Sequence, residues 1–370
     1  MFLHSSAGRY GADRQLLAVA SGLDRARFTP VAVLPEPGAL AGLLEDAGVE
    51  TLAAPLAVLR RADLGPAAVW RMLRADVREL ESLARERGAA LVHSNTSVIV
   101  SGRPLARKLG VPHVQHVREL YPRLPLAWPL WRRRLLASER LLCVSRAVAA
   151  QFPAREQIAV VHDGLPRAPQ RTNRAEARAA LGIDRDTFAV AVLGRVSAWK
   201  GQDVLARALA ESPLASIGAV GLVAGAPWPG AERPAAELER LRGTLELGDR
   251  LRVLGFQAEV GPLLGAVDAV AVPSTRPDPF PNAALEAAAA GVPVVAAAHG
   301  GLPEMLRDGE TGVLVAPGEP AALAAALRAL ADDPARAERL GQAAAADVAA
   351  RFSAERMLSA VQAQYDALLR

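Results

Sequence analysis

Cysteine and aromatic side chains are scarce in this chain of 370 residues, and each scarcity excludes a class of structure or function. The one cysteine, Cys143, excludes an intramolecular disulfide, and its place in an apolar run predicts a buried thiol in a reducing compartment. Aromatic residues make up 4%, which leaves little material for stacking nucleic-acid bases. Lysine and arginine number 43 against 39 acidic residues, a net charge of only +4, so we expect no nucleic-acid partner.

Long apolar runs are also missing. No segment approaches the ~18 uninterrupted apolar residues of a transmembrane helix, and Met1–Ser6 lacks the basic stretch and apolar run of a signal peptide. With 51% hydrophobic and 22% charged residues, the chain still contains enough apolar material for a sizeable core. We therefore expect a folded cytoplasmic protein, with attachment to the inner face of the membrane left open.

The sequence does contain a regular alternation of short β-rich runs and longer stretches of helical period. Several of the short runs are continuously apolar, which is typical of parallel strands covered on both faces. The candidate strands are Val31–Leu34, Ala90–His93, His113–Val117, Arg140–Val144, Ile158–Val161, Phe188–Leu193, Gly218–Ala224, Leu251–Leu254, Ala269–Val272, Val292–Ala297 and Val313–Val315, after a very short one at Met1–His4. The candidate helices include Ala12–Leu23, Leu40–Ala47, Ala67–Arg87, Arg103–Leu109, Ala175–Leu181, Asp203–Glu211, Ala235–Leu245, Ala283–Ala290, Pro320–Asp332 and Ala354–Leu369. This alternation predicts an α/β fold with parallel sheets.

A pause in the alternation indicates the domain organisation. The stretch 163–173 is polar, contains proline and lacks apolar periodicity, which is typical of a linker. Together with the chain length it predicts two doubly wound Rossmann-like domains, at 1–164 and 165–350, that face each other across a cleft. The last segment, 351–370, is expected to form a helix that can belong to either domain or cross back to the first.

The segment 277–295 carries the strongest chemical signal. Its prolines favour an extended approach, a helix is expected to begin near Pro281–Asn282, and Gly291 is expected to end it in a left-handed conformation. The start of such a helix has unpaired amide groups and a partial positive charge, which suit a phosphate. Glu286 lies one turn further on, where it can accept hydrogen bonds from sugar hydroxyls, and Asp278 precedes the helix. The alternative is an Ala-rich packing helix with one exposed glutamate.

A second signal is the pair Arg195 and Lys200, five residues apart between glycines, where a predicted strand ends and a helix begins. That edge of an open α/β sheet is where ligands bind. The planar fork of arginine and the point charge of lysine suit a diphosphate, which has several anionic oxygens. The alternative is two solvated surface cations.

The third signal is the pair Gly300-Gly301, which follows the predicted strand Val292–Ala297 after Ala298-His299 and precedes Leu302-Pro303-Glu304. Paired glycines let the backbone approach a ligand closely, although such turns are common. None of these loops matches a P-loop or the G-x-G-x-x-G pattern of dinucleotide-binding folds.

In their order and spacing these elements closely resemble family-4 (group 1) retaining glycosyltransferases of the GT-B fold. The resemblance is specific over residues 185–320, where it extends to Asp308-Gly309 and Gly312–Val315, and is looser in the first half. It implies that a nucleotide-sugar donor binds the second domain and that the sugar is transferred with retention of configuration. It also implies that no metal ion or other cofactor is required.

The resemblance also implies roles for individual residues. Arg195 and Lys200 would hold the diphosphate and act as catalytic residues, Asp278 would contact the donor sugar, and Glu286 the ribose. This chain has Asp278 where the family usually has glutamate, one methylene longer, which leaves the sugar selectivity open. The other donor-binding residues that we expect are Gly11, Phe280, Asn282, Ala283, Gly300 and Gly301.

The acceptor side is expected in the first domain. By analogy with the family, a histidine at the end of a strand there lies near the reacting sugar, and we expect His116 in this catalytic role. The other candidates on the acceptor side are His93, Asn95, Arg118 and Glu119. For each histidine a structural role in the interior is the alternative. His113 and His116 lie three apart on a predicted strand, which turns them to opposite faces and argues against a metal site.

The segment Trp128–Arg134 contains two tryptophans and three arginines, so it could touch an anionic membrane surface or receive a lipid-linked acceptor. A partly buried helix with a basic face is the alternative. As a whole, the sequence predicts an enzyme that moves a sugar from a nucleotide-diphosphate sugar to a hydroxyl of an unidentified glycan, lipid-linked or small-molecule acceptor. A hydrolysing sugar-nucleotide epimerase and a non-catalytic sugar or nucleotide binder are the alternatives.

Overall fold

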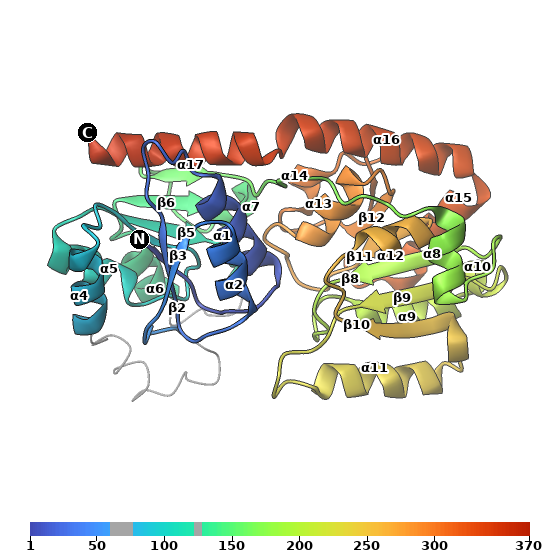
Figure 1. The fold of residues 1–370 in the computed structure, drawn as a ribbon. Helices are drawn as coiled ribbons and strands as arrows, with labels where there is room; N and C mark the ends of the chain where they lie inside the picture. The colour runs from blue at the N-terminus through green and yellow to red at the C-terminus, as the bar shows by residue number, and fades with distance from the viewer. Residues whose placement is uncertain (60–76, 122–127) are drawn as a thin grey trace. The chain divides into compact units, whose positions relative to one another are not determined.

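The computed structural model describes residues 1–59, 77–121 and 128–370. The chain divides into two compact units (Figure 1). The first contains Met1–Pro166 and Ala354–Arg370, and the second contains Arg167–Ser353. Each unit is built on a parallel sheet with helices between successive strands, so the expected α/β class of two Rossmann-like sheets is confirmed.

The first unit has its sheet in the order β3-β2-β1-β4-β5-β6-β7, with every described pairing parallel. Its strands are β1 (Phe2–Leu3), β2 (Val31–Leu34), β3 (Glu50–Ala53), β4 (Val92–Ser94), β5 (His113–Val117), β6 (Arg140–Cys143) and β7 (Ile158–Val160). Its helices are α1 (Gly11–Gly22), α2 (Ala39–Asp46), α4 (Arg78–Glu86), α5 (Gly102–Leu109), α6 (Trp128–Leu135), α7 (Arg146–Ala149) and α17 (Ala354–Leu369).

Alternate residues of the central strands face opposite layers of helices. Phe2, Ala32 and Leu34 pack with apolar residues of α1, α2 and α17. Leu3 and Val33 point the other way and pack with α4 and α5. Helix α17 contacts α1 within the first of these layers (Figure 1). Because both faces are covered, these strands are continuously apolar, which makes them recognisable in the sequence.

The second unit has its sheet in the order β10-β9-β8-β11-β12-β13, again parallel throughout the described pairings. Its strands are β8 (Ala189–Leu193), β9 (Val220–Ala224), β10 (Leu251–Gly255), β11 (Ala269–Val272), β12 (Val294–Ala297) and β13 (Val313–Val315). Its helices are α8 (Arg174–Leu181), α9 (Gln202–Ala210), α10 (Ser212–Ala215), α11 (Arg233–Thr244), the 3-10 turn Gly248–Arg250, α12 (Gly261–Ala266), α13 (Asn282–Ala289), α14 (Leu302–Met305), α15 (Pro320–Asp332) and α16 (Pro334–Arg351). Residues of α9, α10, α11, α15 and α16 share one apolar core with the sheet, while α13 lies against β11 and β12.

Some elements differ from the sequence-based expectation. The expected helix Ala67–Arg87 is described only as α4, since residues 67–76 fall outside the described ranges. Strand β3 was not expected, because it is an edge strand with exposed ends and no apolar run. Helix α16 was also missed, although Asp333 marks its start by accepting a hydrogen bond from the backbone N–H of Arg336 at 2.9 Å.

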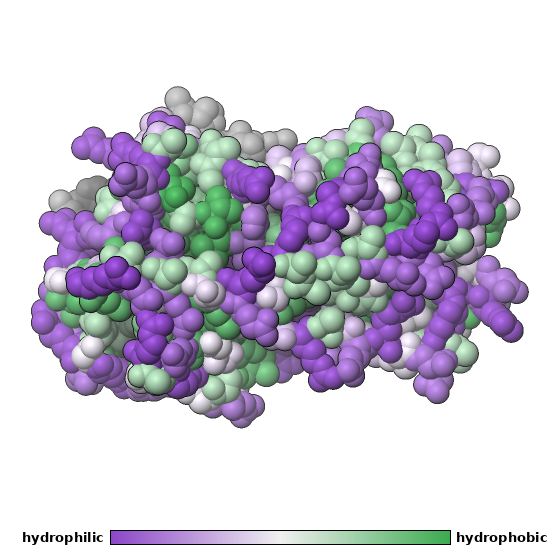
Figure 2. All heavy atoms as spheres, turned by 90° about the horizontal axis from the view of Figure 1, so that it is seen from above, coloured by the Kyte–Doolittle hydropathy of each residue, from purple (hydrophilic) through white to green (hydrophobic). Residues whose placement is uncertain are grey.

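The surface of the described residues is mixed in polarity. Figure 2 shows hydrophilic side chains over much of one face, with apolar atoms in patches between them. Within the ranges that the structure describes, no helix combines the length and the apolar character needed to span a bilayer.

Candidate functional site

Apart from Gly11, which lies in the first unit, the residues expected to bind a donor lie at or just beyond the carboxyl ends of the strands of the second unit. Arg195 and Lys200 follow β8, Asp278 follows β11 and precedes α13, and Gly300 follows β12. Strands β8, β11 and β12 are neighbours in a parallel sheet, so their following loops share one edge. The fold therefore brings together three segments that are separate in the sequence, at the edge where α/β sheets bind ligands.

Lys200 and Asp278 form an ion pair at this edge. The Nζ of Lys200 donates to Oδ2 of Asp278 at 2.6 Å, and the Ser274 hydroxyl donates to the same oxygen at 3.3 Å. The Asp278 side chain is 5% exposed, whereas that of Lys200 is 23% exposed. Asp278 thus orients the ammonium while part of it remains open to an anion from solvent. From the sequence, Lys200 and Asp278 were expected in separate roles, and their ion pair was not predicted.

Two glycines hold the loops of this edge together. Gly201 has φ +79°, and a Cβ there would lie 2.0 Å from the carbonyl oxygen of Pro273, on the loop after β11. Gly300 has φ +62°, and a Cβ would lie 2.2 Å from the carbonyl oxygen of Asp278. The same Asp278 oxygen accepts a hydrogen bond from the N–H of Gly301 at 2.8 Å. Glycine is required here because the loops approach one another, and Gly300-Gly301 fixes the backbone of Asp278.

Arg195 is oriented by an aromatic ring. Its guanidinium carbon lies 4.1 Å from the ring centroid of Trp228, on the loop after β9. Its carbonyl oxygen accepts a hydrogen bond from Nε2 of Gln202 at 3.0 Å. Trp228 was not among the residues expected from the sequence. The signal that could have found it is an aromatic residue on the loop after a strand adjacent to β8.

Helix α13 begins and ends where the sequence predicts. It starts at Asn282 after Pro281, and the chain turns at Gly291 with φ +70°. Glu286 is buried, with 7% of its surface exposed, which disagrees with the alternative of an exposed glutamate on a packing helix. The start of α13 therefore presents helix amides and a shielded carboxylate at the same edge as Lys200.

The remaining donor residues expected in the second unit lie at or just before the start of α13. Asn282 and Ala283, in the first turn of α13, are half-buried and remain partly accessible. Phe280 is buried and packs edge-on against Phe352, with ring centroids 5.4 Å apart. Its observed contact supports the loop before α13, and its role toward a donor stays a prediction.

In the first unit, Asp13 organises the loop that leads to Gly11, the first residue of α1. Its carboxylate binds Nε2 of His4 at 2.8 Å, the hydroxyl of Ser6 at 2.5 Å and the backbone N–H of Tyr10 at 2.8 Å. Burial disfavours the charged carboxylate, but the hydrogen bonds and charge of its partners outweigh burial and lower the pKa of Asp13. His4 and Asp13 were not expected from the sequence, because their contact depends on how α1 packs beside β1.

His116, the residue expected in the catalytic role on the acceptor side, lies in the interior of the first unit. Its side chain has no exposed surface, and burial holds its pKa well below the ordinary value. Its ring lies 5.5 Å from that of His93, whose Nδ1 is 2.5 Å from the hydroxyl of Tyr365 on α17. This burial and these ring contacts fit the alternative of structural histidines, and a catalytic role of His116 stays a prediction.

The other acceptor-side candidates are joined in one buried network. Nη1 of Arg118 lies 2.6 and 2.7 Å from the two carboxylate oxygens of Asp163, and Nε of Arg118 donates to the carbonyl of Asn95 at 3.0 Å. Glu119 accepts from the backbone N–H groups of Ser97 and Arg118, at 3.1 and 3.0 Å. Burial raises the pKa of Glu119. These contacts fix the carboxyl ends of β4 and β5, and a direct role toward an acceptor stays a prediction.

His113 is accounted for by structural contacts. Its two ring nitrogens lie 2.9 Å from the hydroxyls of Ser94 and Ser138, and burial lowers its pKa to about 3. Across the described part of the chain, no group of three or more histidine, cysteine, aspartate or glutamate side chains is placed to hold a metal ion.

Helix α6 is largely anchored to its own unit. Trp128 stacks on Tyr121 with ring centroids 5.0 Å apart, and Arg134 donates to the carbonyl of Val100 at 2.8 Å. Leu130 is 65% exposed and Arg133 is also exposed. These internal contacts fit the alternative of a partly buried helix, and the prediction of membrane contact now rests on Leu130 and its basic neighbours.

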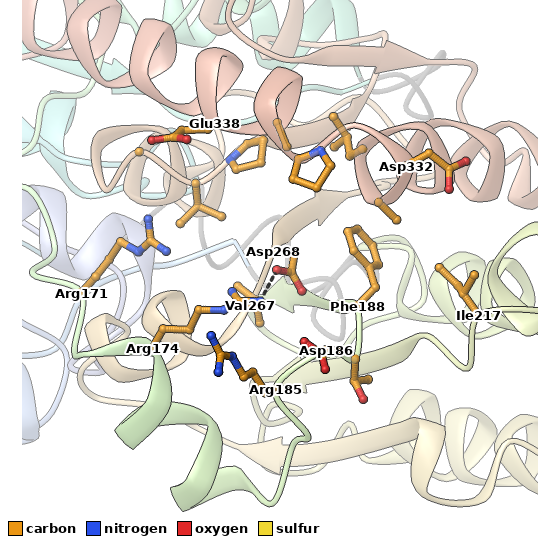
Figure 3. A pocket seen from close by; sticks show the side chains of 18 residues that line it. Arg171, Arg174, Arg185, Asp186, Phe188, Ile217, Val267, Asp268, Asp332 and Glu338 are labelled. Atoms are coloured by element: carbon orange, nitrogen blue, oxygen red, sulfur yellow. Dashed lines mark hydrogen bonds and ion pairs between the residues drawn. The ribbon is translucent and has the colours of Figure 1, made fainter.

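A hollow of about 620 Å³ lies at the opposite edge of the second sheet (Figure 3). Its lining includes Phe188, Val267 and Pro293, which come just before β8, β11 and β12. Charges of both signs surround it, and Asp268 is already paired with Arg174 at 2.6 Å. Because these are the amino ends of the strands, this hollow is separate from the edge that holds Lys200 and Asp278.

Comparison with known families identifies the chain. Residues 173–347 match the family described as glycosyl transferases group 1, and residues 10–167 match glycosyltransferase family 4. The chain belongs to the group 1, family 4 glycosyltransferases. The expected resemblance is therefore confirmed in both halves, including the first, where the sequence offered only scattered features.

Curated relatives of this family member include D-inositol 3-phosphate glycosyltransferases. The protein of that name from Streptomyces avermitilis is 33% identical over 308 residues, covering 78% of this chain and 61% of the relative. The one from Mycolicibacterium gilvum is 41% identical over 201 residues, covering 53% of this chain and 43% of the relative. The chain thus spans between about two fifths and three fifths of the length of these relatives.

Solved structures agree with the family over the whole chain. The structure of Anabaena Alr3699/HepE in complex with UDP and glucose is similar with a TM-score of 0.86 and 26% identity, covering 99% of both chains. The same protein in complex with UDP-glucose gives a TM-score of 0.85 and 25% identity. Sucrose-phosphate synthase from Thermosynechococcus elongatus, with 21% identity and a TM-score of 0.79, shares the fold. The GT-B class expected from the sequence is confirmed.

Proposed function

We propose that this protein is a glycosyltransferase that moves a sugar from a nucleotide-diphosphate sugar to an acceptor hydroxyl, with retention of configuration and without a metal ion. The observation that carries the proposal is the convergence of Lys200, Arg195, Asp278 and the start of α13 at one carboxyl edge. The family match and the UDP and UDP-glucose complexes of the similar Anabaena protein support a nucleotide-sugar donor.

The electrostatics of this edge suit a departing diphosphate. As the bond between sugar and phosphate lengthens, negative charge grows on the phosphate oxygens. Lys200, held by Asp278 at 2.6 Å, and Arg195, stacked on Trp228, are oriented before a ligand arrives. Cations fixed in advance stabilise the transition state more than the ground state, because they need little reorganisation as charge develops.

The carboxylates would handle the sugars of the donor. Glu286, shielded one turn into α13, can accept hydrogen bonds from ribose hydroxyls. Asp278 can contact the transferred sugar, although one of its carboxylate oxygens already binds Lys200. The shorter side chain of Asp278 and its ion pair with Lys200 limit how far its carboxylate reaches. Asp278 and Lys200 would therefore set the sugar selectivity jointly.

The acceptor proton needs a destination. In a retaining transfer on one face of the sugar, the departing phosphate itself can take this proton, so a side chain acting as a general base is not required. The burial of His116 is compatible with that route. With the charge on the diphosphate held by Lys200 and Arg195, a metal ion is not needed for that purpose.

The acceptor provides the hydroxyl that receives the sugar. The curated relatives are named for D-inositol 3-phosphate, so a phosphorylated polyol is the first acceptor to try. Glycan and lipid-linked acceptors follow, the latter with vesicles because of the exposed Leu130 on α6.

The proposal is tested in two stages. Calorimetric titration with UDP, ADP, GDP and dTDP, each with EDTA, should show that at least one binds. Proton NMR of the matching nucleotide sugar, with and without D-inositol 3-phosphate and a glycan panel, should show acceptor-dependent donor consumption and a product with the donor's anomeric configuration. Epimerised sugar without acceptor would establish the epimerase instead, and binding without consumption under every condition would establish a non-catalytic binder.

A further inference from the structure

Trp228 has an unusual environment for the largest aromatic side chain. It lies on the loop between β9 and α11 and is 40% exposed, in a chain with few aromatic residues. Its ring is stacked by Arg195, whose guanidinium carbon lies 4.1 Å from the ring centroid. The two loops are also joined through the backbone, since the N–H of Val196 donates to the carbonyl of Ala226 at 3.2 Å.

We propose that Trp228 is a positioning residue, which holds the Arg195 guanidinium in place to bind the pyrophosphate of the donor. This inference rests on the proposed function and adds to it a residue outside the motifs that the sequence brings out. It assigns the tryptophan to the pyrophosphate end of the ligand, through Arg195, and not to the nucleobase.

The geometry of a stacked guanidinium supports this assignment. The N–H donors of arginine lie in the plane of the guanidinium group, so a ring that covers its face leaves the in-plane directions to phosphate oxygens. The ring also attracts the cation without neutralising it. Holding a long side chain in one orientation before binding removes part of the entropy that binding would otherwise cost.

The two cations of the site are thus oriented by different means. Lys200 is held by the carboxylate of Asp278, which cancels part of its charge, and its Nζ also lies 4.5 Å from the ring centroid of Trp199. The Arg195 guanidinium is held by the uncharged ring of Trp228. Both side chains are therefore oriented before a ligand binds.

An exposed indole could instead stack directly on the base of the nucleotide. The two roles differ in whether the effect of replacing Trp228 on binding depends on the presence of Arg195. A positioning residue affects only what Arg195 binds, so its contribution disappears when Arg195 is removed. A base platform acts without Arg195 and has no effect on a ligand that lacks a base.

The test uses calorimetry with two probes, inorganic pyrophosphate and UDP, on the full chain. The variants are Trp228→Leu, Trp228→Phe, Arg195→Ala and the double variant Trp228→Leu with Arg195→Ala. Phe256→Leu is the matched control, because Phe256 is 37% exposed and follows β10, the strand on the far side of β9 from β8. Thermal melting verifies that each variant is folded, which is expected for a substitution on an exposed loop.

We expect Trp228→Leu to weaken binding of both probes by about two- to thirtyfold, the range of cation–π contacts. Trp228→Phe should restore most of the affinity, Phe256→Leu should leave pyrophosphate binding unchanged, and Trp228→Leu should add less than about twofold in the Arg195→Ala background. The positioning role is overturned if Trp228→Leu leaves the pyrophosphate affinity unchanged, or if the losses of binding free energy from the two substitutions add fully in the double variant. Either result leaves the proposed function standing. If the parent protein binds neither pyrophosphate nor any of UDP, ADP, GDP and dTDP, the proposed function fails together with the positioning role.

Discussion

Replacing Lys200 with alanine should have two separable effects, one on the chemistry and one on stability. The lysine is expected to stabilise the departing diphosphate, and it also neutralises Asp278, whose side chain is only 5% exposed. Lys200→Ala therefore removes a catalytic cation and at the same time leaves a largely enclosed carboxylate without its counter-ion.

The magnitudes follow from the contact. Two charges 2.6 Å apart attract by about 6 kcal/mol at an effective dielectric of about 20. Desolvation of Asp278 and the exposure of Lys200 offset much of this, so the net loss of unfolding free energy should be about 1–3 kcal/mol. For a domain of this size that is a fall in Tm of about 2–12 °C. The loss of a preorganised charge should lower kcat/KM by about 100- to 1000-fold.

A second substitution separates the two effects. Adding Asp278→Asn to Lys200→Ala removes the stranded carboxylate, so most of the unfolding free energy should return while turnover stays low. Unfolding free energies come from urea titration and turnover from NMR of donor consumption. Near-normal turnover in Lys200→Ala refutes its part in the chemistry, and a double variant that is no more stable than Lys200→Ala refutes the stranded-carboxylate reasoning.

Three further predictions test the surroundings of the site. Glu286→Gln should weaken UDP binding by about 10- to 150-fold, since hydrogen bonds to charged groups contribute about 1.5–3 kcal/mol; equal calorimetric affinity would contradict contact with the ribose. Gly201→Ala should lower the unfolding free energy, measured by urea titration, more than the control Gly48→Ala does. Both glycines have positive φ, but of the two only Gly201 has a backbone atom in the way of a Cβ, the carbonyl oxygen of Pro273 at 2.0 Å. Equal losses in the two variants would exclude that clash. Burial lowers the pKa of His113 in the folded state to about 3, below the unfolded value of about 6.5, so acid should destabilise the fold. The unfolding free energy should fall as the pH drops below ~6.5, by about 2 kcal/mol at pH 5.0 from this histidine. A His113→Asn variant should lose that much less unfolding free energy over the same pH range, and an identical pH dependence would refute this reasoning.

The sequence alone predicted the elements whose cause is local. Strands such as Ala269–Val272 are continuously apolar because helices cover both faces of the sheet. Helix α13 could be placed to within a residue, since proline favours its start and Gly291 takes the left-handed conformation at its end. The spacing of Arg195 and Lys200 between a strand and a helix likewise predicted the edge at which they lie.

Only the tertiary structure decided which side chains meet. The pair of Lys200 and Asp278 joins residues that are 78 positions apart, and Trp228 contacts Arg195 from the loop after a neighbouring strand. His116 lies in the interior because strand β5 is central in its sheet and covered on both faces, which its local sequence does not reveal. Propensities and motifs report on neighbours along the chain, whereas burial and pairing depend on strand order and helix packing, and those are set by the fold as a whole.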